Sequence, residues 1–418
     1  MDHRPILKTG SMSDAAAPAP AEPVLVEQAV FTSVRSPTGE GYRLIAASKG
    51  LRPDERTEIT RRAPSHGSLD EADGAAAGLL AFPLPAGRVC VARCRHAGRE
   101  QTARGGQRVY SHFVVLDAQA DLAFGCDPVR VYGALSAAIG ETPDLSPPPM
   151  LELLALSPQH RSACSPFEVA AGTGVGGLHA DSGCRRSASA PAGGFGQGIE
   201  VALGLVLALL RNERIVATGG EAGIDLLATV TACLPLPRRR GLAVSVGLKY
   251  APVRQTRLCL LARNTPETQR AIRGQSIRHV DLDAAPERPP SDYDPWLAWL
   301  GRRLSAGRIA EVERLTAAIE KDASPRRLAR FAALCDDLDR VETADEQALR
   351  RLSALCASRQ PTGALEARLV RQLREAVERR ASRLREQTDA ATVSGASAAG
   401  GAVLIRSAPP LGESNGTG

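Results

Sequence analysis

The spacing of apolar residues changes near Trp296, and this change separates two kinds of structure along the chain. Before it, apolar and polar residues alternate in short runs such as RVCVARCRH (88–96) and GLAVSVGLKY (241–250), which is typical of β-strands. After it, RLARFAALCDDL and ALEARLVRQLREAVERRASRLRE carry apolar residues at spacings of three and four, which is typical of amphipathic helices. Because helices are mixed with strands only in the first part, the sequence predicts an α+β fold followed by a small helical C-terminal bundle.

Composition and turn signals divide the chain further. The two ends lack any apolar pattern and are expected to be disordered. The proline run at 147–149 ends the first group of strands, and GCRRSASAPAGGFGQG has the composition of a mobile loop. The predicted segments are a disordered stretch over 1–24, an α+β N-terminal domain over 25–150, an α+β middle domain over 151–285 with a mobile loop at 183–198, a helical domain over 292–387 and a disordered tail over 388–418.

The composition disfavours several classes of protein. The 418 residues carry a net charge of +6, which is small for this length and argues against a nucleic-acid partner. Aromatic residues make up 3%, too few for a platform that stacks single-stranded bases. The nine cysteines include no CxxC pair, so neither a disulfide scaffold nor a zinc ribbon is indicated.

No segment has the character of a membrane anchor. The N-terminus lacks the long apolar core of a secretory signal. The longest apolar run, VALGLVLALL at 201–210, is about half as long as a membrane span. We therefore expect a cytoplasmic protein that has no membrane partner.

Two glycine-containing stretches were tested as nucleotide sites. In GYRLIAASKGLRPDERTEI (41–59) a strand leads into a helix at Pro53. The residues before the helix read Ser-Lys-Gly, so they do not match the GxxxxGK[ST] motif of a phosphate-binding loop. GTGVGG at 172–177 matches GxGxxG, yet no helix pattern follows it, as a dinucleotide site requires. The sequence therefore predicts no bound cofactor, and Lys49 lies at a strand-to-helix corner.

Several of these stretches resemble a known family. QAVFTSVRSPTGEGYRLIAASKGL, followed by APSHGSL, FPLPAGRVCVARC and RGGQRVYSHFVVLD, resembles the second type of N-terminal domain of GTPase-associated proteins over about residues 27–150. LPLPRRRGLAVSVGLKYAPVR is similar to the middle part of the same proteins. These are bacterial proteins encoded beside a GTPase in predicted biological-conflict systems. The resemblance implies a non-enzymatic accessory or adaptor protein whose partner is a GTPase or a complex containing one, and it transfers no catalytic residue.

A Cys/His arrangement keeps an enzymatic alternative open. Cys94 and His96 share one face of the strand 88–96, because side chains two residues apart point the same way. If the next strand pairs with Cys94 facing His112, these three side chains form a candidate metal site, and Cys94 with His112 a candidate nucleophile and base. A register shift of one residue would move His112 to the other face. A half-buried strand with core thiols is the other interpretation, and a fourth zinc ligand is missing, so no metal is expected.

Two hairpin tips are the best candidates for partner binding, because exposed loops on a rigid scaffold are where recognition concentrates. Their glycines allow adaptable backbones, and arginine pairs well with carboxylates and phosphates. The candidate residues are Arg35, Glu40 and Tyr42 around the first tip, and Arg104, Gly105 and Gly106 in the second.

The last helical segment offers a third function. Its arginines would suit nucleic acid, but glutamates are interleaved with them, which favours a solvated helix with ion pairs. Nucleic-acid binding through this helix therefore remains an alternative to the adaptor. The arginines are at positions 368, 371, 374, 379, 380, 383 and 385.

Overall fold

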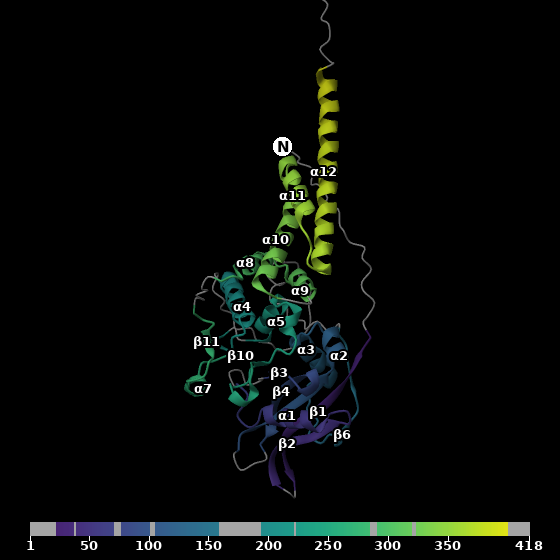
Figure 1. Cartoon of the computed structure of the whole chain (residues 1–418). Helices are drawn as coiled ribbons and strands as arrows, with labels where there is room; N and C mark the ends of the chain where they lie inside the picture. The colour runs from purple at the N-terminus through teal and green to yellow at the C-terminus, as the bar shows by residue number, and fades with distance from the viewer. Residues whose placement is uncertain are drawn as a thin grey trace, which may run out of the picture. The chain divides into compact units, whose positions relative to one another are not determined.

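The structure of the chain is a computed structural model (Figure 1). A mixed β-sheet and helices share the described residues, and a helical region follows, which confirms the predicted α+β fold. The chain divides into two compact units, Met1–Arg327 and Leu328–Gly418. The described residues are 22–36, 39–70, 77–100, 105–158, 194–220, 223–284, 291–319 and 323–399.

Among the described residues of the first unit, eleven strands form one sheet. The N-terminal part contributes β1 (Val24–Ser36), β2 (Gly39–Ser48), β3 (Ala77–Pro83), β4 (Val89–Arg99), β5 (Gln107–Leu116), β6 (Met150–Leu151) and β7 (Leu154–Leu156). The middle part contributes β8 (Ile215–Thr218), β9 (Val244–Val246), β10 (Leu258–Leu261) and β11 (Arg278–Asp281). The strand order is β11-β8-β10-β9-β3-β4-β5-β1-β2-β6, and β7 pairs with β1.

The two halves of the sheet differ in strand direction. From β3 to β2 all neighbours are antiparallel, because the short connections β1–β2, β3–β4 and β4–β5 permit only that arrangement. In contrast, β9, β10, β8 and β11 are parallel to one another. The helices α5 (Ile224–Cys233) and α7 (Pro266–Ile272) supply two of the crossovers that parallel pairing requires.

One end of the sheet collects most of its turns. β9 runs antiparallel to β3, so the carboxyl ends of the parallel strands lie on the side where β3 begins. The β4–β5 and β1–β2 turns lie on that same side, because Ala77 of β3 pairs with Arg95 near the end of β4 and the next strands alternate in direction. We call this side, with its two hairpin turns and four carboxyl ends, the hairpin end of the sheet.

Helices flank the sheet of the first unit (Figure 1). On one face of the antiparallel half, Ile59 of α1 is fully buried in a cluster with Phe31, Phe82 and Phe113. On the parallel half, α4 packs against α5 and α8. The helical elements of this unit are α1 (Pro53–Arg62), η2 (Pro85–Gly87), α2 (Ala118–Ala123), α3 (Pro128–Ile139), α4 (Gly194–Leu210), α5, α6 (Leu236–Arg239), η3 (Pro252–Arg254), α7, α8 (Asp294–Ser305) and α9 (Ile309–Ala317).

The β3–β9 junction is unusually close. A Cβ atom on Gly78 of β3 would lie 2.8 Å from the Leu248 Cδ2 atom, so no larger residue fits without displacing that buried side chain. Gly247, directly after β9, has a left-handed backbone with φ 66°. A Cβ atom on Gly247 would lie 3.3 Å from the Ala77 carbonyl oxygen. These two glycines allow the two halves of the sheet to meet.

The segment after α1, residues 63–70, ties the junction together, and we call it the α1 loop. Its Asp70 N–H donates to the Gly247 carbonyl at 2.9 Å, and the Asp70 Oδ2 atom accepts from the Ala262 N–H, after β10, at 3.0 Å. The Lys249 N–H donates to the Ser68 carbonyl at 2.8 Å. The α1 loop therefore contacts the residues that follow β9 and β10.

A pair of buried arginines reinforces this contact. Arg254 in η3 is 4% exposed and donates to the carbonyls of Lys249 at 2.6 Å and Arg62 at 3.3 Å, and to the Ser68 hydroxyl at 3.0 Å. Arg62 at the end of α1 donates in return to the Arg254 carbonyl at 2.9 Å. Burial lowers the pKa of Arg254. For Arg254, carbonyl and hydroxyl oxygens take the place of a carboxylate partner, whereas Arg62 also pairs with Glu58. The N-terminal and middle parts of the chain are thus cross-linked through the backbone.

The second unit is helical. It holds most of α10 (Pro325–Val341), together with α11 (Glu346–Ser358) and α12 (Ala364–Ala399). Apolar residues of all three helices are buried, among them Phe331, Leu352 and Leu373. The predicted helical domain began at 292, but α8 and α9 belong to the first unit.

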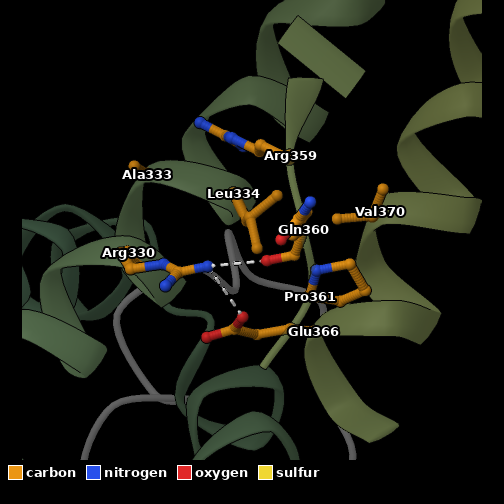
Figure 2. A pocket seen from close by; sticks show the side chains of 8 residues that line it. All are labelled: Arg330, Ala333, Leu334, Arg359, Gln360, Pro361, Glu366 and Val370. Carbon is orange, nitrogen blue, oxygen red and sulfur yellow. Dashed lines mark hydrogen bonds and ion pairs between the residues drawn. The ribbon is translucent and has the colours of Figure 1, made fainter. Parts of the chain in front are cut away.

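A buried carboxylate holds the start of α12 in place (Figure 2). The Glu366 Oε2 atom accepts from the Thr362 N–H at 2.9 Å, the Thr362 hydroxyl at 2.8 Å and the Arg330 guanidinium at 3.2 Å. A small cavity of about 90 Å³ lies beside it, with Arg359 and Gln360 in its wall. This arrangement joins α10 to the connection between α11 and α12.

The segment ends differ from the sequence prediction in three places. β1 already begins at Val24, whereas 1–21 lie outside the described residues. α4 begins at Gly194, inside the predicted loop 183–198, of which 183–193 are not described. α12 continues to Ala399, past the predicted start of a disordered tail at 388. That prediction used the loss of apolar spacing, but an exposed helix needs no apolar stripe, and the alanines of this stretch favour a helix.

The closeness of the β3–β9 junction predicts unequal effects of two glycine substitutions. Gly247→Ala and Gly67→Ala both place a side chain at a left-handed residue, with φ of 66° and 67°, which costs about 1–2 kcal/mol. Only Gly247→Ala also presses on a neighbouring carbonyl, because nothing lies within 4 Å of a Cβ atom on Gly67. We expect the free energy of unfolding to fall by about 1 kcal/mol or more beyond the loss in the control, Gly67→Ala. Equal losses in chemical denaturation would show that the junction tolerates a methyl group.

Candidate functional site

One buried carboxylate connects the two predicted hairpin tips. Glu100 follows β4, and its side chain is fully buried. The Oε2 atom accepts a hydrogen bond from the Tyr42 hydroxyl at 2.6 Å, and the Oε1 atom accepts one from the Ser33 hydroxyl. Ser33 and Tyr42 pair across the β1–β2 hairpin. Glu100 therefore holds the end of this hairpin against the β4–β5 turn.

Tyr42 is a bridge in this arrangement. Its hydroxyl donates to Glu100 and accepts a hydrogen bond from the Val109 N–H of β5 at 3.0 Å. Burial, together with the hydrogen bond to Glu100, raises the pKa of Tyr42 above its usual value. The hydroxyl thus stays protonated and remains a donor to Glu100. The Tyr42 ring stacks on Phe31 at 5.9 Å between centroids, which anchors it on the α1 side of the sheet.

A histidine of the α1 loop lies next to the same carboxylate. The His66 Nδ1 atom is 4.0 Å from the Glu100 Oε2 atom. Gly106 has a left-handed backbone with φ 84°, and a Cβ atom there would lie 3.0 Å from His66 Cε1. The Glu100 N–H closes the turn by donating to the Gly106 carbonyl at 2.9 Å. Gly106 is therefore needed both for the turn and for the approach of His66.

Arg108 completes what we call the Glu100 cluster: Ser33, Tyr42, His66, Glu100 and Arg108. It is 7% exposed, and its guanidinium donates to the Ala97 carbonyl of β4 at 3.0 Å and to the Ser33 carbonyl of β1 at 3.3 Å. Since Arg108 belongs to β5, one side chain links three neighbouring strands. The cluster makes the hairpin end a rigid platform.

The exposed features of the hairpin end sit around this cluster. Arg35 and Glu40 form an ion pair of 2.8 Å across the β1–β2 hairpin, with side chains 76% and 36% exposed. Gly105 and Gly106 are both left-handed, with φ of 68° and 84°. Arg104 lies outside the described residues. The structure thus brings five of the six predicted partner-binding residues to one end of the sheet.

Four members of the cluster were not predicted from the sequence. Ser33, His66, Glu100 and Arg108 lie in stretches that carry no chemical motif, and the first three are far apart along the chain. Only the pairing of β1 with β5, and the path of the α1 loop, brings them together. A strand that ends in glutamate before a glycine-rich turn was the single local hint.

The strand register separates the predicted Cys/His pair. Cys94 pairs with Ser111, and it is Arg93 that pairs with His112. Paired residues of antiparallel strands share a face, so the Cys94 thiol and the His112 imidazole lie on opposite faces of the sheet. His96, opposite Val109, stays on the Cys94 side. The condition for the Cys/His/His site, Cys94 facing His112, is therefore not met.

The thiols of β4 have the character of core residues. Cys90 and Cys94 are fully buried in the cluster that contains Ile59 of α1. Burial raises the pKa of Cys94 to about 11 and that of Cys90 well above its usual value. A thiolate nucleophile requires the opposite shift. Among the described residues, no group of three His, Cys, Asp or Glu side chains is close enough to hold a metal ion.

His112 lies on the other face, where it is 8% exposed. Burial, aided by the nearby charge of Arg95, lowers the pKa of His112 to about 4. Its Nε2 atom is 2.8 Å from the Gln28 Oε1 atom, and the neutral ring donates there. The Gln28 amide nitrogen donates in turn to the Glu152 carbonyl at 2.8 Å. This chain of hydrogen bonds fastens β5, β1 and the segment before β7, which is a structural role.

The corner at Lys49 and Gly50 holds no nucleotide cradle. The first turn of α1 is occupied by its own carboxylates: Glu55 Oε2 accepts from the Arg52 N–H and Asp54 Oδ1 from the Glu55 N–H, both at 3.0 Å. A Cβ atom on Gly50 would lie 1.9 Å from a Glu27 carboxylate oxygen, so the glycine leaves room for that side chain. Lys49 is exposed. Carboxylates at this helix start would repel a phosphate.

The arginines of α12 are partly engaged by acids. Arg379 lies 3.8 Å from Glu375 on the same helix, and Arg383 lies 3.2 Å from Glu342 at the end of α10. Both pairs are largely exposed, so each stabilises the fold only slightly. The interleaved charges leave no purely basic stripe on this helix.

Comparison with protein families identifies the N-terminal part. Residues 25–154 match the family model of GTPase-associated protein 1, N-terminal domain type 2. These residues form a GTPase-associated N-terminal domain. The match ends at the first residue of β7, so this domain contains the Glu100 cluster and both hairpin tips. No curated protein and no solved structure matches the chain.

The helices of the described residues lack the character of membrane spans. Across the described residues, no helix is both long enough and apolar enough to cross a membrane. The apolar run 201–210 belongs to α4, whose last ten residues are nearly all buried against neighbouring elements.

Removing the Tyr42 hydroxyl should destabilise the GTPase-associated domain. Tyr42→Phe removes the hydrogen bond to the buried Glu100 Oε2 atom and takes away the acceptor of the Val109 N–H, which costs about 1–3 kcal/mol. Tyr110→Phe is the matched control, because Tyr110 is 2% exposed but its hydroxyl has no hydrogen bond among the described residues. Chemical denaturation should show a clear loss for Tyr42→Phe only. Similar values for both variants would mean that Glu100 does not depend on Tyr42.

The low pKa of His112 predicts a stability that falls in acid. The unfolded chain takes up this proton near pH 6.5, whereas the folded chain resists it until about pH 4, so stability is lost as pH falls between these values. The loss at pH 4.5 is about 2.5 kcal/mol relative to neutral pH. His112→Gln should lack this component, so the difference between wild type and variant narrows in acid. A His112 imidazole that titrates near pH 6.5 by NMR would contradict this assignment.

Proposed function

We propose that this chain is a non-enzymatic accessory or adaptor protein of a bacterial GTPase-associated system, with a GTPase or a complex containing one as its partner. The observation that carries the proposal is the Glu100 cluster, a buried network that fixes two exposed hairpin tips at one end of a GTPase-associated domain. A rigid cluster that supports exposed, adaptable tips suits recognition of another protein, because a preorganised surface loses little conformational entropy on binding. The proposal includes a role in biological conflict, which the resemblance implies, and a cytoplasmic location.

The chemistry of the tips supports a protein partner. Arg35 is held by Glu40 in an exposed pair, which contributes little to stability and is easily exchanged. A carboxylate of a partner can replace Glu40 and bind the planar guanidinium through two hydrogen bonds. Gly105 and Gly106 let the second tip adjust its backbone. The proposed surface also includes Glu40, and Arg104, which precedes Gly105 in the sequence, is proposed as a further member.

The alternatives have less support from the geometry. The enzymatic alternative near residues 90–112 relies on Cys94, whose raised pKa and burial oppose nucleophilic chemistry, and on His112, which lies on the other face. The nucleic-acid alternative relies on α12, where acids are interleaved with the arginines. The adaptor proposal requires neither a reactive group nor a basic stripe.

The proposal is tested by binding to the GTPase encoded beside this chain. Arg35→Ala and Arg104→Ala should each weaken the association about thirtyfold, because a buried interfacial arginine is worth about 2 kcal/mol or more. Arg350→Ala is the matched control, since Arg350 is also an exposed arginine, 77% exposed and paired with Glu346, but lies in the second unit. Surface plasmon resonance would measure all three.

Thermal unfolding of the same variants separates binding from folding. Arg35 is exposed, so its substitution should leave the melting temperature nearly unchanged. Normal binding by both tip variants would rule out the hairpin end as the interface. Failure of the wild-type chain to bind any neighbouring GTPase would reject the adaptor function itself.

A further inference from the structure

Two arginines donate hydrogen bonds to one neutral oxygen at the end of the sheet opposite the hairpin end. The Asn212 Oδ1 atom accepts hydrogen bonds from Arg238 Nη1 at 2.7 Å and from Arg257 Nη2 at 3.1 Å. Asn212 lies between α4 and β8, Arg238 lies in α6, and Arg257 directly precedes β10. All three thus sit at the amino ends of the parallel strands.

This pair of guanidinium groups has no carboxylate partner among the described residues. The nearest acid along the chain, Glu213, is engaged by Arg278 at 3.2 Å. Burial, together with the charge of Arg238, lowers the pKa of Arg257, as expected for two cations held close without an anion. Each guanidinium has five N–H donors, and the bonds to Asn212 use one from each. Several donors therefore remain for a ligand.

Three other arginines of the first unit have different partners. Arg88 binds Glu55, whereas the deeply buried Arg239 and Arg254 are satisfied by carbonyl or hydroxyl oxygens of the chain. Arg238 and Arg257 are only half-buried, so a ligand can reach them from solvent. A groove of about 510 Å³, lined by Arg238 and Tyr293 among others, opens beside Arg238. The site can therefore accept an anionic group that belongs to a larger ligand.

Asn212 has the geometry of a positioning residue. Its backbone is left-handed, with φ 62°, a conformation that asparagine tolerates better than most residues. This turn, directly after α4, directs the side-chain oxygen between the two guanidinium groups. A neutral acceptor there brings the arginines together without cancelling their charge, which a carboxylate would do.

We propose that Arg238 and Arg257, positioned by Asn212, form a binding site for an oxyanion, a phosphoryl or carboxylate group. Two convergent guanidinium groups match the oxygen spacing of either group through paired N–H donors. The site is distinct from the hairpin end and does not depend on the proposed adaptor function.

Calorimetric titration at constant ionic strength tests the site with two probes. Inorganic phosphate stands for a free phosphoryl ligand, and a triglutamate peptide stands for an acidic segment of a protein. We expect the wild-type chain to bind at least one of them, and Arg238→Gln and Arg257→Gln to weaken that binding roughly tenfold or more each. Tighter binding of one probe identifies the source of the oxyanion.

Two further variants make the result decisive. Arg263→Gln removes an exposed arginine at the opposite end of the parallel strands, after the carboxyl end of β10, and should leave binding unchanged. Asn212→Gly keeps the left-handed turn without strain but removes the oxygen that aligns the arginines, so it should also weaken binding while the chain stays folded. Absence of binding by the wild-type chain, or an equal loss in Arg263→Gln, would overturn the proposal, because the second result indicates a general charge effect.

Discussion

The antiparallel pairing of β3 with β9 is the contact on which the rest of the first unit depends. It joins a sheet built from hairpins to one built from crossovers, and it places the carboxyl ends of the parallel strands beside the hairpin turns. Gly78 and Gly247 make the approach possible, because a side chain at either position would meet atoms of the opposite segment. Without this pairing the N-terminal and middle parts of the chain would be two small separate sheets, each with an exposed edge.

Buried arginines secure the same architecture. Arg108, Arg239 and Arg254 are each less than a tenth exposed, and all three donate to backbone carbonyls of other elements. A guanidinium can do this because its several donors diverge in one plane, whereas a lysine offers a single point charge. Arginine greatly outnumbers lysine in this chain, and part of this excess serves to cross-link strands and helices.

The two proposed surfaces lie at opposite ends of the strands of one sheet. The hairpin end carries the exposed tips beside the Glu100 cluster. The amino ends of the parallel strands carry Arg238 and Arg257 around Asn212. The α1 loop contacts the Glu100 cluster through His66 and the parallel strands through Asp70. The two proposed sites are therefore at opposite ends of the strands and are linked through the α1 loop and the parallel strands.

The sequence by itself determined the elements, because strand and helix periodicity are local properties. The alternation in 88–96 and 107–117 predicted β4 and β5, and the Ser-Lys-Gly order at 48–50 ruled out a phosphate loop. Only the tertiary structure decided which residues meet. A register one residue away would have placed His112 against Cys94, and nothing local distinguishes the two registers. Glu100 and Asn212 were likewise invisible in the sequence, because their partners come from strands, loops and helices that only the folded sheet brings into reach.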